Sequence, residues 1–308
     1  MKAVRIHNYG GVDELKLEEA PMPSLGPDDV LVRVHAVGVN PFDTIFRQGV
    51  MKDVLPVKLP VVVGQDFAGD VADVGKNVTQ LKKGDRVYGL SRTGSFAEYT
   101  AVPVSALARI PDMVDDKTAA ALPVAGLTAY QLVTQVAKAA PGKTLLIHGA
   151  AGGVGAMAVQ IAKAKGARVI ATAAGEDADY LKQLGADVVV NYQTQRFEDF
   201  AKEVDAVIDL TRSVDVLARS YPLVKKGGVI TATANAIDED KARAMGIGTA
   251  VRFLVKPNTK DFEDLVGLVA KGAVRPRMDK VLPLADVRQA QELIQTSKTH
   301  GKIVLTVA

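Results

Sequence analysis

Residues 148–173 read "HGAAGGVGAMAVQIAKAKGARVIATA", and this stretch decides the fold. It begins where an apolar run ends, passes through a turn of glycine and alanine, and continues with Val154, Ala158 and Ile161 at helical spacing. A second β-branched run closes the stretch at 167–173. A strand, a tight turn, a helix and another strand in this order predict the first βαβ unit of a parallel sheet.

The same alternation continues through the middle of the chain. Strands are predicted at 144–149, 167–173, 187–192, 205–211, 227–234 and 249–255. Helices are predicted between them at 153–165, 176–184, 197–203, 213–220 and 238–245. Six strands alternating with helices predict a doubly wound α/β domain with the strand order 3-2-1-4-5-6.

The glycine-rich turn is suited to a phosphate ligand. It comprises Gly149, Ala150, Gly152, Gly153, Val154 and Gly155. Small residues let backbone N–H groups and the positive end of a helix approach a pyrophosphate, and Gly155 permits close packing of helix on strand. The turn departs from the pattern G-x-G-x-x-G at Ala150, and a turn that is merely tight is the alternative interpretation. We expect a dinucleotide site here.

The position of a ribose-binding acid carries no carboxylate. About 20 residues beyond the glycines, where an NAD site has Asp or Glu, stand Thr172, Ala173 and Ala174. Without that acid a 2′-phosphate is acceptable, so we predict NADPH. Tyr192 and Arg196 are the candidates for phosphate contact, unless Tyr192 is an ordinary aromatic residue at a strand end.

Other candidate ligand contacts follow from the ends of the predicted strands. In an open α/β sheet, ligands collect at the carboxyl ends of the strands. The residues at these ends are Leu210, Thr233, Phe253, Leu254 and Val255. We expect them to line the cofactor site.

The remainder of the chain is expected to form one β-rich domain. The first 110 residues carry short β-rich runs separated by Pro and Gly, and one helix at 41–49 that begins with Pro41. The segment after Pro257 is too short for a domain of its own, so we expect it to return and complete the first one. The predicted division is 1–117 for this domain, 118–257 for the dinucleotide domain, and 258–308 for the return.

Composition excludes several classes of protein. A net charge of +3, from 38 basic and 35 acidic residues, is too small and too evenly spread for binding to nucleic acid or to a membrane surface. The absence of cysteine excludes disulfides and thiolate catalysis. The N-terminus lacks the apolar core of a signal peptide and no run is long enough to span a bilayer, so we expect a cytoplasmic protein.

Short motifs along nearly the whole chain carry a family resemblance. They are "GVNPFD" (38–43), "GQDFAGDV" (64–71), "GDRVYG" (84–89), "SFAEY" (95–99), "LPVAGLTAY" (122–130), "GAAGGVG" (149–155), "LGAD" (184–187) and "GKIVL" (301–305). Together they resemble the zinc-independent, quinone oxidoreductase-like branch of the medium-chain dehydrogenase/reductase superfamily. The resemblance implies a GroES-like catalytic domain and an NADPH-dependent enzyme that transfers hydride to a quinone or an α,β-unsaturated carbonyl.

The zinc ligands of related alcohol dehydrogenases have no counterpart here. Asn40 stands where those enzymes have Cys, and Gly64-Gln65-Asp66 stands where they have Gly-His-Glu. Asp43 and Asp66 are left without a nitrogen or sulfur partner, and the four histidines are scattered. We therefore expect no metal.

The resemblance also implies roles for three residues. Asn40 matches an Asn-Pro motif whose side chain reaches the nicotinamide ribose or the substrate oxygen, which makes it the candidate catalytic residue; a turn-capping Asn before Pro41 is the alternative. Thr128, at the predicted beginning of a helix, corresponds to a residue beside the nicotinamide half of the cofactor. Lys302 stands where relatives often place a cation near the phosphates, with a solvated lysine as the alternative. No residue emerges as an obligatory general acid.

Alternative functions and the oligomeric state complete the expectations. An enoyl-thioester reductase would share the fold and the cofactor, but no basic patch for an acyl carrier is evident. A cofactor-binding redox sensor or structural protein with little turnover is the alternative from another class. We expect a homodimer in which strand 249–255, an apolar sheet edge with Arg252 as its only charge, pairs with its own copy; coverage of this edge by the segment after Pro257 would leave a monomer.

Overall fold

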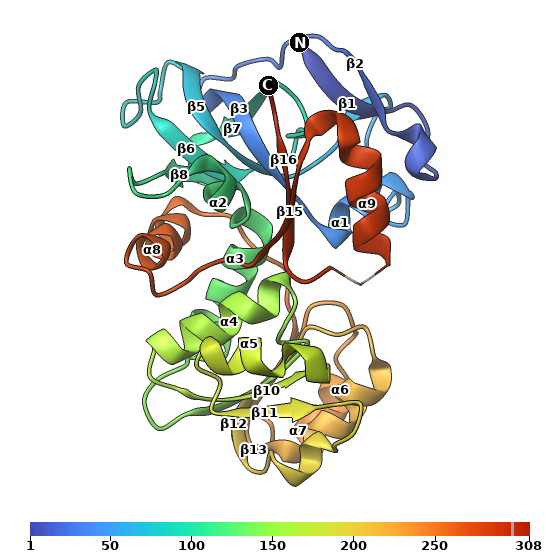
Figure 1. The fold of residues 1–308 in the computed structure, drawn as a ribbon, viewed down its shortest axis with the longest axis vertical. Coiled ribbons are helices and arrows are strands. Elements are labelled where there is room, and N and C mark those ends of the chain that lie inside the picture. The colour runs from blue at the N-terminus through green and yellow to red at the C-terminus, as the bar shows by residue number, and fades with distance from the viewer. Residues whose placement is uncertain (297–298) are drawn as a thin grey trace. The chain divides into compact units, whose positions relative to one another are not determined.

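The glycine-rich turn lies within a six-stranded parallel sheet in the computed structural model, which describes residues 1–296 and 299–308 (Figure 1). The strands are β9 (Thr144–His148), β10 (Arg168–Ala173), β11 (Val188–Asn191), β12 (Val204–Asp209), β13 (Val224–Ala232) and β14 (Thr249–Arg252). Their order in the sheet is β11-β10-β9-β12-β13-β14. The prediction of a doubly wound sheet in the order 3-2-1-4-5-6 is therefore confirmed.

Helices connect these strands on both faces of the sheet. They are α4 (Gly153–Ala164), α5 (Ala178–Gln183), α6 (Val214–Ser220) and α7 (Glu239–Ala244). Strand order runs outward in opposite directions from the β9/β12 pair, and right-handed crossovers then place α4 and α5 on one face and α6 and α7 on the other. The strand order reverses its direction between β9 and β12, and sheets of this kind bind ligands at that point.

Two predicted elements of this sheet were wrong in length. The helix expected at 197–203 is only the 3₁₀ turn Phe197–Asp199, because the buried Phe197 ring packs on the His148 ring, 4.7 Å between centroids, and holds the segment against the sheet. The strand expected at 249–255 ends at Arg252. Its neighbour β13 ends at Ala232, whose carbonyl accepts a last hydrogen bond from the Phe253 N–H, so residues beyond have no strand to pair with.

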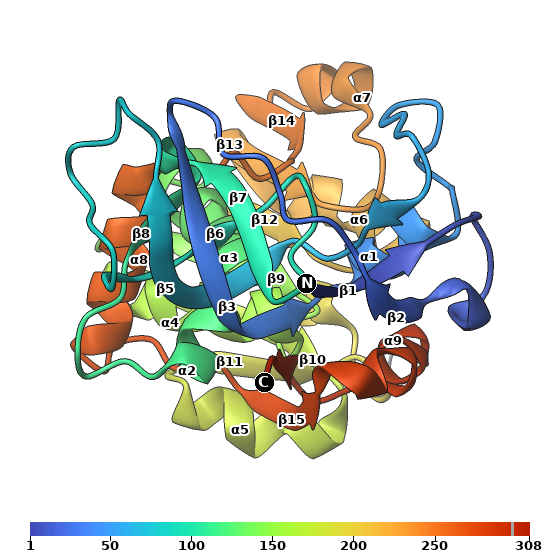
Figure 2. The same cartoon turned by 90° about the horizontal axis from the view of Figure 1, so that it is seen from above.

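The β-rich unit is built on a second, larger sheet (Figure 2). Its strands are β3 (Asp29–Val39), β5 (Asp66–Val74), β6 (Arg86–Leu90), β7 (Tyr99–Pro103), β8 (Leu107–Arg109), β15 (Met278–Pro283) and β16 (Lys302–Thr306). A smaller sheet contains β1 (Lys2–Ile6), β2 (Lys16–Glu19) and β4 (Val61–Val62). The β-rich segment 60–75 is divided between β4 and β5 at Gly64, where φ is +90° and an added Cβ would lie 2.2 Å from the Phe96 ring.

The end of the chain completes the sheet of the β-rich unit. β16 pairs antiparallel with β3, so that Ile303 lies opposite Val39. Unit 1 comprises Met1–Leu127, Pro257–Lys271 and Pro276–Ala308, and unit 2 comprises Thr128–Lys256 and Gly272–Arg275. Residues 118–127 thus lie with unit 1 rather than with the dinucleotide domain of the sequence-based division, since α2 packs on β3 and β5 and the Val124 N–H donates to Asp66 Oδ1 at 2.9 Å.

The remaining helices belong mainly to unit 1. They are α1 (Pro41–Arg47), α2 (Asp116–Ala120), α3 (Pro123–Gln131), α8 (Thr259–Ala270) and α9 (Val287–Gln295), with a π-helical turn at Leu132–Val136 after α3. Within residues 1–296 and 299–308, no helix has both the length and the apolar composition needed to cross a membrane.

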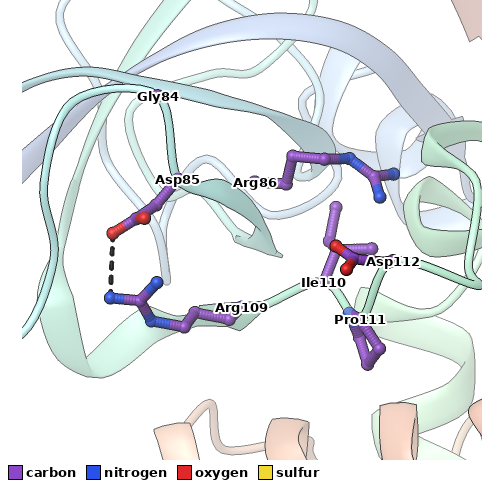
Figure 3. A pocket seen from close by; sticks show the side chains of 7 residues that line it. All are labelled: Gly84, Asp85, Arg86, Arg109, Ile110, Pro111 and Asp112. Carbon is purple, nitrogen blue, oxygen red and sulfur yellow. Dashed lines mark ion pairs between the residues drawn. The ribbon is translucent and has the colours of Figure 1, made fainter.

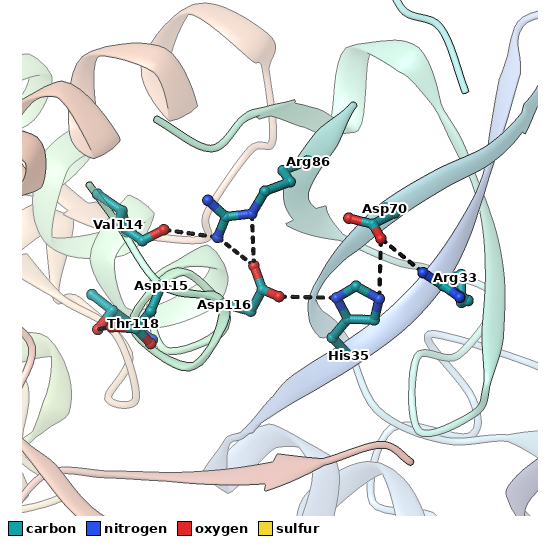
Figure 4. A network of polar contacts seen from close by, with 8 residues as sticks. All are labelled: Arg33, His35, Asp70, Arg86, Val114, Asp115, Asp116 and Thr118. Atoms are coloured by element: carbon teal, nitrogen blue, oxygen red, sulfur yellow. Dashed lines mark hydrogen bonds and ion pairs between the residues drawn. The ribbon is translucent and has the colours of Figure 1, made fainter. Parts of the chain in front are cut away.

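A network of polar contacts fixes α2 on the sheet of unit 1 (Figure 4). Asp116 in the first turn of α2 lies 2.9 Å from His35 Nδ1 and also pairs with Arg86. The other ring nitrogen of His35 lies 3.3 Å from Asp70, which pairs with Arg33 at 2.9 Å. These residues are partly exposed, so the network adds little to the free energy of unfolding. Its main effect is to fix the position of α2.

His148, the last residue of β9, is a buried neutral bridge in unit 2. Its Nδ1 lies 3.0 Å from Thr172 Oγ1 and its Nε2 lies 3.0 Å from Ser220 Oγ. Because Ser220 donates its only proton to the Val216 carbonyl at 2.7 Å, it accepts from Nε2, and Nδ1 accepts from Thr172. Burial lowers the pKa of His148 to about 4.

Replacement of His148 by Gln should reduce the dependence of stability on pH. The unfolded chain binds a proton at its ordinary pKa near 6.5 and the folded chain only near 4, so His148 destabilises the fold as the pH falls through that window. The loss should reach about 3 kcal/mol in the wild type. Chemical denaturation at pH 4, 5, 6 and 7 measures it, with His7→Gln at a half-exposed site as the control. Equal pH dependence in wild type and His148→Gln would contradict this account.

Candidate functional site

The glycine-rich turn presents unpaired backbone donors at the start of α4. Gly149 leaves β9 with φ +69°, and the Ala150 N–H donates to the Thr172 carbonyl at 3.1 Å, which ties the turn to β10. Gly152 is the N-cap of α4, and the first turn of the helix contains no acidic residue. The first N–H groups of a helix have no partner within it and carry the positive end of its dipole, so this turn is suited to an anion.

Two glycines of the turn serve different purposes. A Cβ added to Gly155 would lie 2.3 Å from the Gly149 carbonyl oxygen and 2.7 Å from Ala150 Cα, so Gly155 is required for packing of α4 against the turn. A Cβ added to Gly152 would meet only the Gly149 oxygen, at 3.5 Å, and φ there is −71°. The fold alone does not require glycine at 152, so this position leaves room for a ligand beside the backbone.

The structure brings most of the predicted strand-end residues to one edge of the sheet. Leu210, Thr233, Phe253 and Tyr192 each follow a strand directly, and each donates its backbone N–H to a carbonyl of the neighbouring strand, at 2.8–3.2 Å. The hydrogen-bond ladder therefore extends one residue beyond four of the strands. These residues line the carboxyl edge, beside the turn that follows β9.

The candidate phosphate contacts lie exposed after β11. The Tyr192 side chain is 60% exposed and the Arg196 side chain is 73% exposed. Arg196 Nε lies 4.0 Å from Glu198, whose two oxygens accept from Arg219 at 2.6 and 2.9 Å. The guanidinium of Arg196 is thus only loosely paired and is available to an incoming phosphate.

Other predicted contacts lie differently from expectation. Thr172 is buried, and its hydroxyl is engaged by His148, so it supports the turn from beneath; Ala173 beside it is buried as well. Thr128 lies in the second turn of α3, not at the beginning of a helix, because α3 begins at Pro123. Leu254 and Val255 follow β14, and the Leu254 side chain is 69% exposed.

Asp209 at the end of β12 is a residue that sequence analysis missed. One of its carboxylate oxygens accepts from the Thr211 N–H at 2.9 Å and from the Thr211 hydroxyl at 2.7 Å, and the other accepts from Asn235 at 3.2 Å. Burial raises its pKa, while the Thr211 hydrogen bonds oppose this shift. The group fixes the two loops that carry Leu210 and Thr233. An Asp at the carboxyl end of a predicted strand was the available signal.

In unit 1, Asn40 is held at the junction of β3 and α1. It is the N-cap of α1, with φ −126° and ψ 153°, and Pro41 occupies the first helical position. Asp43 Oδ2 accepts from the Asn40 backbone N–H at 2.7 Å. Asn40 can therefore be the N-cap of α1 and also contact a ligand. Its side-chain oxygen accepts a hydrogen bond from Lys302.

That oxygen belongs to a buried polar cluster around Lys302. Lys302 Nζ donates to Asn40 Oδ1 at 2.5 Å, to the Val39 carbonyl at 3.1 Å and to Asp66 Oδ2 at 3.2 Å. Lys302 is 4% exposed, so the alternative interpretation of Lys302 as a solvated lysine is excluded. Burial raises the pKa of Asp66, and the Lys302 ammonium and then the Asn40 amide oppose the shift.

These residues do not fit a zinc ion. Zinc prefers thiolate, imidazole and carboxylate ligands in a tetrahedral set. The chain has no cysteine, Asn40 and Gln65 are amides, and the Asp66 carboxylate is already paired with an ammonium. The side chains around Asn40 are therefore arranged around the Lys302 ammonium, and they do not provide a set of ligands for a metal ion.

A surface hollow of unit 1 lies apart from the predicted residues (Figure 3). It is lined by Gly84, Asp85, Arg86, Arg109, Ile110, Pro111 and Asp112. Arg109 pairs with Asp85 at 2.8 Å, and Arg86 pairs with Asp116. Both cations are neutralised, and none of the predicted site residues lines the hollow.

Replacement of Asp43 by Asn should stabilise the protein at neutral and higher pH. Burial, opposed by the Asn40 N–H and assisted by nearby Asp66, raises the pKa of Asp43 to about 7. The unfolded carboxyl ionises near 3.8, so the stability that its protonated form contributes is lost as the pH rises from about 4 to 7. The variant should gain on the order of 4 kcal/mol relative to wild type across that window. Denaturation with Asp53→Asn as the exposed control measures it, and a gain that is constant with pH would contradict the raised pKa.

Comparison with known proteins supports the same assignment along nearly the whole chain. A family model described as "Alcohol dehydrogenase GroES-like domain" matches residues 26–112, and one described as "Zinc-binding dehydrogenase" matches residues 184–305. The NADPH-dependent alkenal/one oxidoreductase, chloroplastic, of Arabidopsis thaliana is 35% identical over 319 residues, which cover 99% of this chain and 79% of the relative. The quinone oxidoreductase of Sus scrofa is 32% identical over 323 residues, which cover 99% of this chain and 97% of the relative.

Solved structures give the same result for the fold. The quinone oxidoreductase from Coxiella burnetii matches with a TM-score of 0.92 and 32% identity, over 100% of this chain and 99% of that one. These relatives agree with two features of the structure. One is the glycine-rich turn in a six-stranded parallel sheet, and the other is the β-rich unit that the C-terminal strand completes. The chain belongs to the quinone oxidoreductase-like branch of the medium-chain dehydrogenase/reductase superfamily.

Proposed function

We propose that this protein is an NADPH-dependent oxidoreductase that reduces quinones or α,β-unsaturated carbonyls. The observation that carries the proposal is the open backbone at Gly152, which the fold itself does not require to be glycine. The names of the relatives, an alkenal/one oxidoreductase that is NADPH-dependent and several quinone oxidoreductases, support the class of reaction. We further propose a cytoplasmic location.

The residues of unit 2 fit a phosphorylated dinucleotide. The N–H groups at the start of α4 would hold the pyrophosphate, and Arg196 with Tyr192 would contact the 2′-phosphate. No carboxylate stands at 172–174 to repel that phosphate. We therefore propose a preference for NADPH over NADH that is modest, because Arg196 is the one cation assigned to the phosphate.

The chemistry needs little more from the protein than binding and orientation. Bound NADPH supplies the hydride. Asn40 in unit 1 offers an amide donor toward a ligand oxygen, and the reaction is proposed to proceed without zinc because the Asn40 cluster is unsuited to that ion. A quinone or an enone suits such a site, since it accepts hydride without a Lewis acid.

The proposal is tested by NADPH oxidation with a panel of quinones, enones and enoyl thioesters. Turnover with quinones or enones, retained after exhaustive chelation, is the expected result. Gly152→Val should fold normally but bind NADPH at least about tenfold more weakly, measured by titration of NADPH fluorescence. Gly155→Val is the matched control: it should lower the melting temperature, because its side chain meets the turn. Preference for enoyl thioesters, or wild-type NADPH binding by Gly152→Val, would contradict the proposal.

We also propose that the protein is a homodimer that pairs through β14. This strand is the edge of the six-stranded sheet, and within the part of the chain that the structure describes its only paired neighbour is β13. Its exposed apolar side chains include Val251, which is 37% exposed. Pairing with a second copy would satisfy the free backbone groups of the edge.

Backbone alternation identifies which residues face that free edge. The Phe253 N–H and the Val251 carbonyl both point toward β13, since they bond to the Ala232 oxygen and the Thr231 hydroxyl. In a strand, successive residues direct their N–H and C=O groups to opposite sides. The groups of Ala250 and Arg252 therefore face outward and would form the ladder to the second copy.

Replacement of Ala250 by Pro should convert the dimer to a monomer. Proline removes the outward N–H but leaves the bonds of Val251 to β13, and it is tolerated at sheet edges. Light scattering at micromolar concentration should give about 65 kDa for wild type, twice the 32.5 kDa of the chain, and the monomer mass for the variant. Ala250→Ser, which keeps the N–H, should remain a dimer. A wild type of 32.5 kDa would contradict the proposal.

A further inference from the structure

The ammonium group of Lys302 has no donor left for a ligand. An ammonium has three N–H bonds, and Lys302 has three acceptors: the Asn40 amide oxygen, the Val39 carbonyl and the Asp66 carboxylate. Lys302 is buried, and Asp66 is completely buried. A phosphate would have to displace one of these partners. The contacts of Lys302 therefore point to a function inside unit 1 and not to direct binding of the cofactor.

The ammonium also decides how the Asn40 amide is oriented. Because Lys302 can only donate, the atom that it contacts at 2.5 Å must be the amide oxygen. The NH₂ end of Asn40 is thereby directed away from Lys302. Rotation of the amide would place two donors against each other, at the cost of the short charge-assisted hydrogen bond.

The NH₂ end of Asn40 is buried and makes no hydrogen bond. Asn40 is 2% exposed, and its Nδ2 has no acceptor within hydrogen-bonding geometry. The Asn40 amide lies beside the Asp66 carboxylate and favours its charged form, but at a geometry too poor to satisfy the buried Nδ2 donor. A buried donor without a partner is costly, which indicates that a ligand oxygen completes it.

The backbone of Asn40 is fixed from the other side. Asp43 Oδ2 accepts the Asn40 N–H at 2.7 Å, and Pro41 limits the chain at the start of α1. Asp43 and Lys302 thus hold the same residue at its backbone and at its side-chain oxygen. Only the NH₂ group is left for a ligand.

We propose that Lys302 is a positioning residue that acts through Asn40: its ammonium holds the amide oxygen so that the NH₂ group donates to an oxygen of the bound ligand. This inference rests on the proposed reductase function. The ligand oxygen is either the carbonyl of the acceptor, where negative charge develops when hydride is added to the conjugated system, or a hydroxyl of the cofactor ribose. Both are acceptors, and they are distinguished below by measurement of the two ligands separately.

The alternative role for Lys302 is simple charge balance. Two buried carboxylates, Asp43 and Asp66, lie near this one ammonium, and its loss would leave Asp66 unpaired. Such a loss would destabilise the fold whatever Asn40 does. A test must therefore remove the ammonium both with and without the opposing charge.

A double-mutant cycle between Lys302→Met and Asn40→Ala tests the proposal. Methionine preserves an unbranched apolar chain but cannot donate. Lys302→Met should lower kcat about 100-fold in the wild-type background, the loss typical of a misplaced catalytic group, and should have no further effect in Asn40→Ala. Lys302→Arg, which keeps the charge and the donors, should recover most of the activity. Equal losses in both backgrounds would overturn the proposal.

A second pair of variants separates positioning from charge balance. Asp66→Asn with Lys302→Met removes both charges, and its amide oxygen can still accept from Val124. This double variant should recover the melting temperature but not kcat. Asp66→Asn alone leaves the buried ammonium without its counter-charge and should lower the melting temperature, which the double variant restores. Recovery of both stability and kcat in the double variant would show that Lys302 serves charge balance only, and would overturn the proposal.

Separate measurements for the acceptor and for NADPH identify the ligand oxygen that Asn40 contacts. They also distinguish failure of this inference from failure of the proposed reductase function. If Asn40 donates to the acceptor, Lys302→Met lowers kcat and leaves the NADPH dissociation constant unchanged; if it donates to the ribose, NADPH binding weakens as well. In the ligand-free protein labelled with ¹⁵N-asparagine, the Asn40 NH₂ signals should be sharp in wild type and broadened in Lys302→Met. Sharp signals in both would overturn the positioning role. A wild type that is sharp but has no turnover, together with broadened signals in Lys302→Met, would overturn the reductase function alone.

Discussion

A single buried ammonium group connects three parts of unit 1 that are far apart in the sequence. Lys302 of strand β16 contacts the junction of β3 and α1, at Val39 and Asn40, and Asp66, the first residue of β5. A charge can remain in such a place only when its hydrogen bonds are all made and a counter-charge lies beside it. Lys302 meets both conditions, so the position of β16 against β3, the strand–helix junction at Asn40 and the burial of Asp66 depend on one another.

Unit 2 depends on a steric constraint instead. The backbone of the turn after β9 and the first turn of α4 approach too closely for any side chain at Gly155. This contact fixes where the helix begins and therefore where its free N–H groups point. His148 secures the same turn from below through Thr172, while Asp209 fixes the loop after β12. Close packing thus builds the candidate anion site of unit 2, whereas hydrogen bonds of charged groups build the Asn40 cluster of unit 1.

The sequence was sufficient for the parallel sheet because its signals are local. Apolar runs of strand length, helical spacing and a glycine turn specify the βαβ units without reference to distant residues. The same reasoning found the residues at the carboxyl edge, since strand ends are visible in the pattern. It overestimated β14, because the length of an edge strand is set by where its neighbour ends, and it overestimated the helix at 197–203, where the packing of Phe197 on His148 outweighs local spacing.

The environment of Lys302 could not be predicted in this way. A lysine near the end of a chain is solvated in most proteins, and only the pairing of β16 with β3 places it beside Asn40 and Asp66. Nothing in the local sequence of Thr172 indicated that its hydroxyl faces a histidine instead of a ligand. Both features arise from tertiary contacts between residues that are distant in the sequence, and single-sequence periodicity does not carry such information.

The discontinuous course of unit 1 also affects how the protein is made. Unit 2 is nearly contiguous, from Thr128 to Lys256, whereas unit 1 requires residues on both sides of it. During synthesis Asp66 is made 236 residues before the lysine that pairs with it. The unit that comes first in the sequence therefore reaches its final form last, after the ribosome has added β16, and the second unit can fold while the first still waits for its final strand.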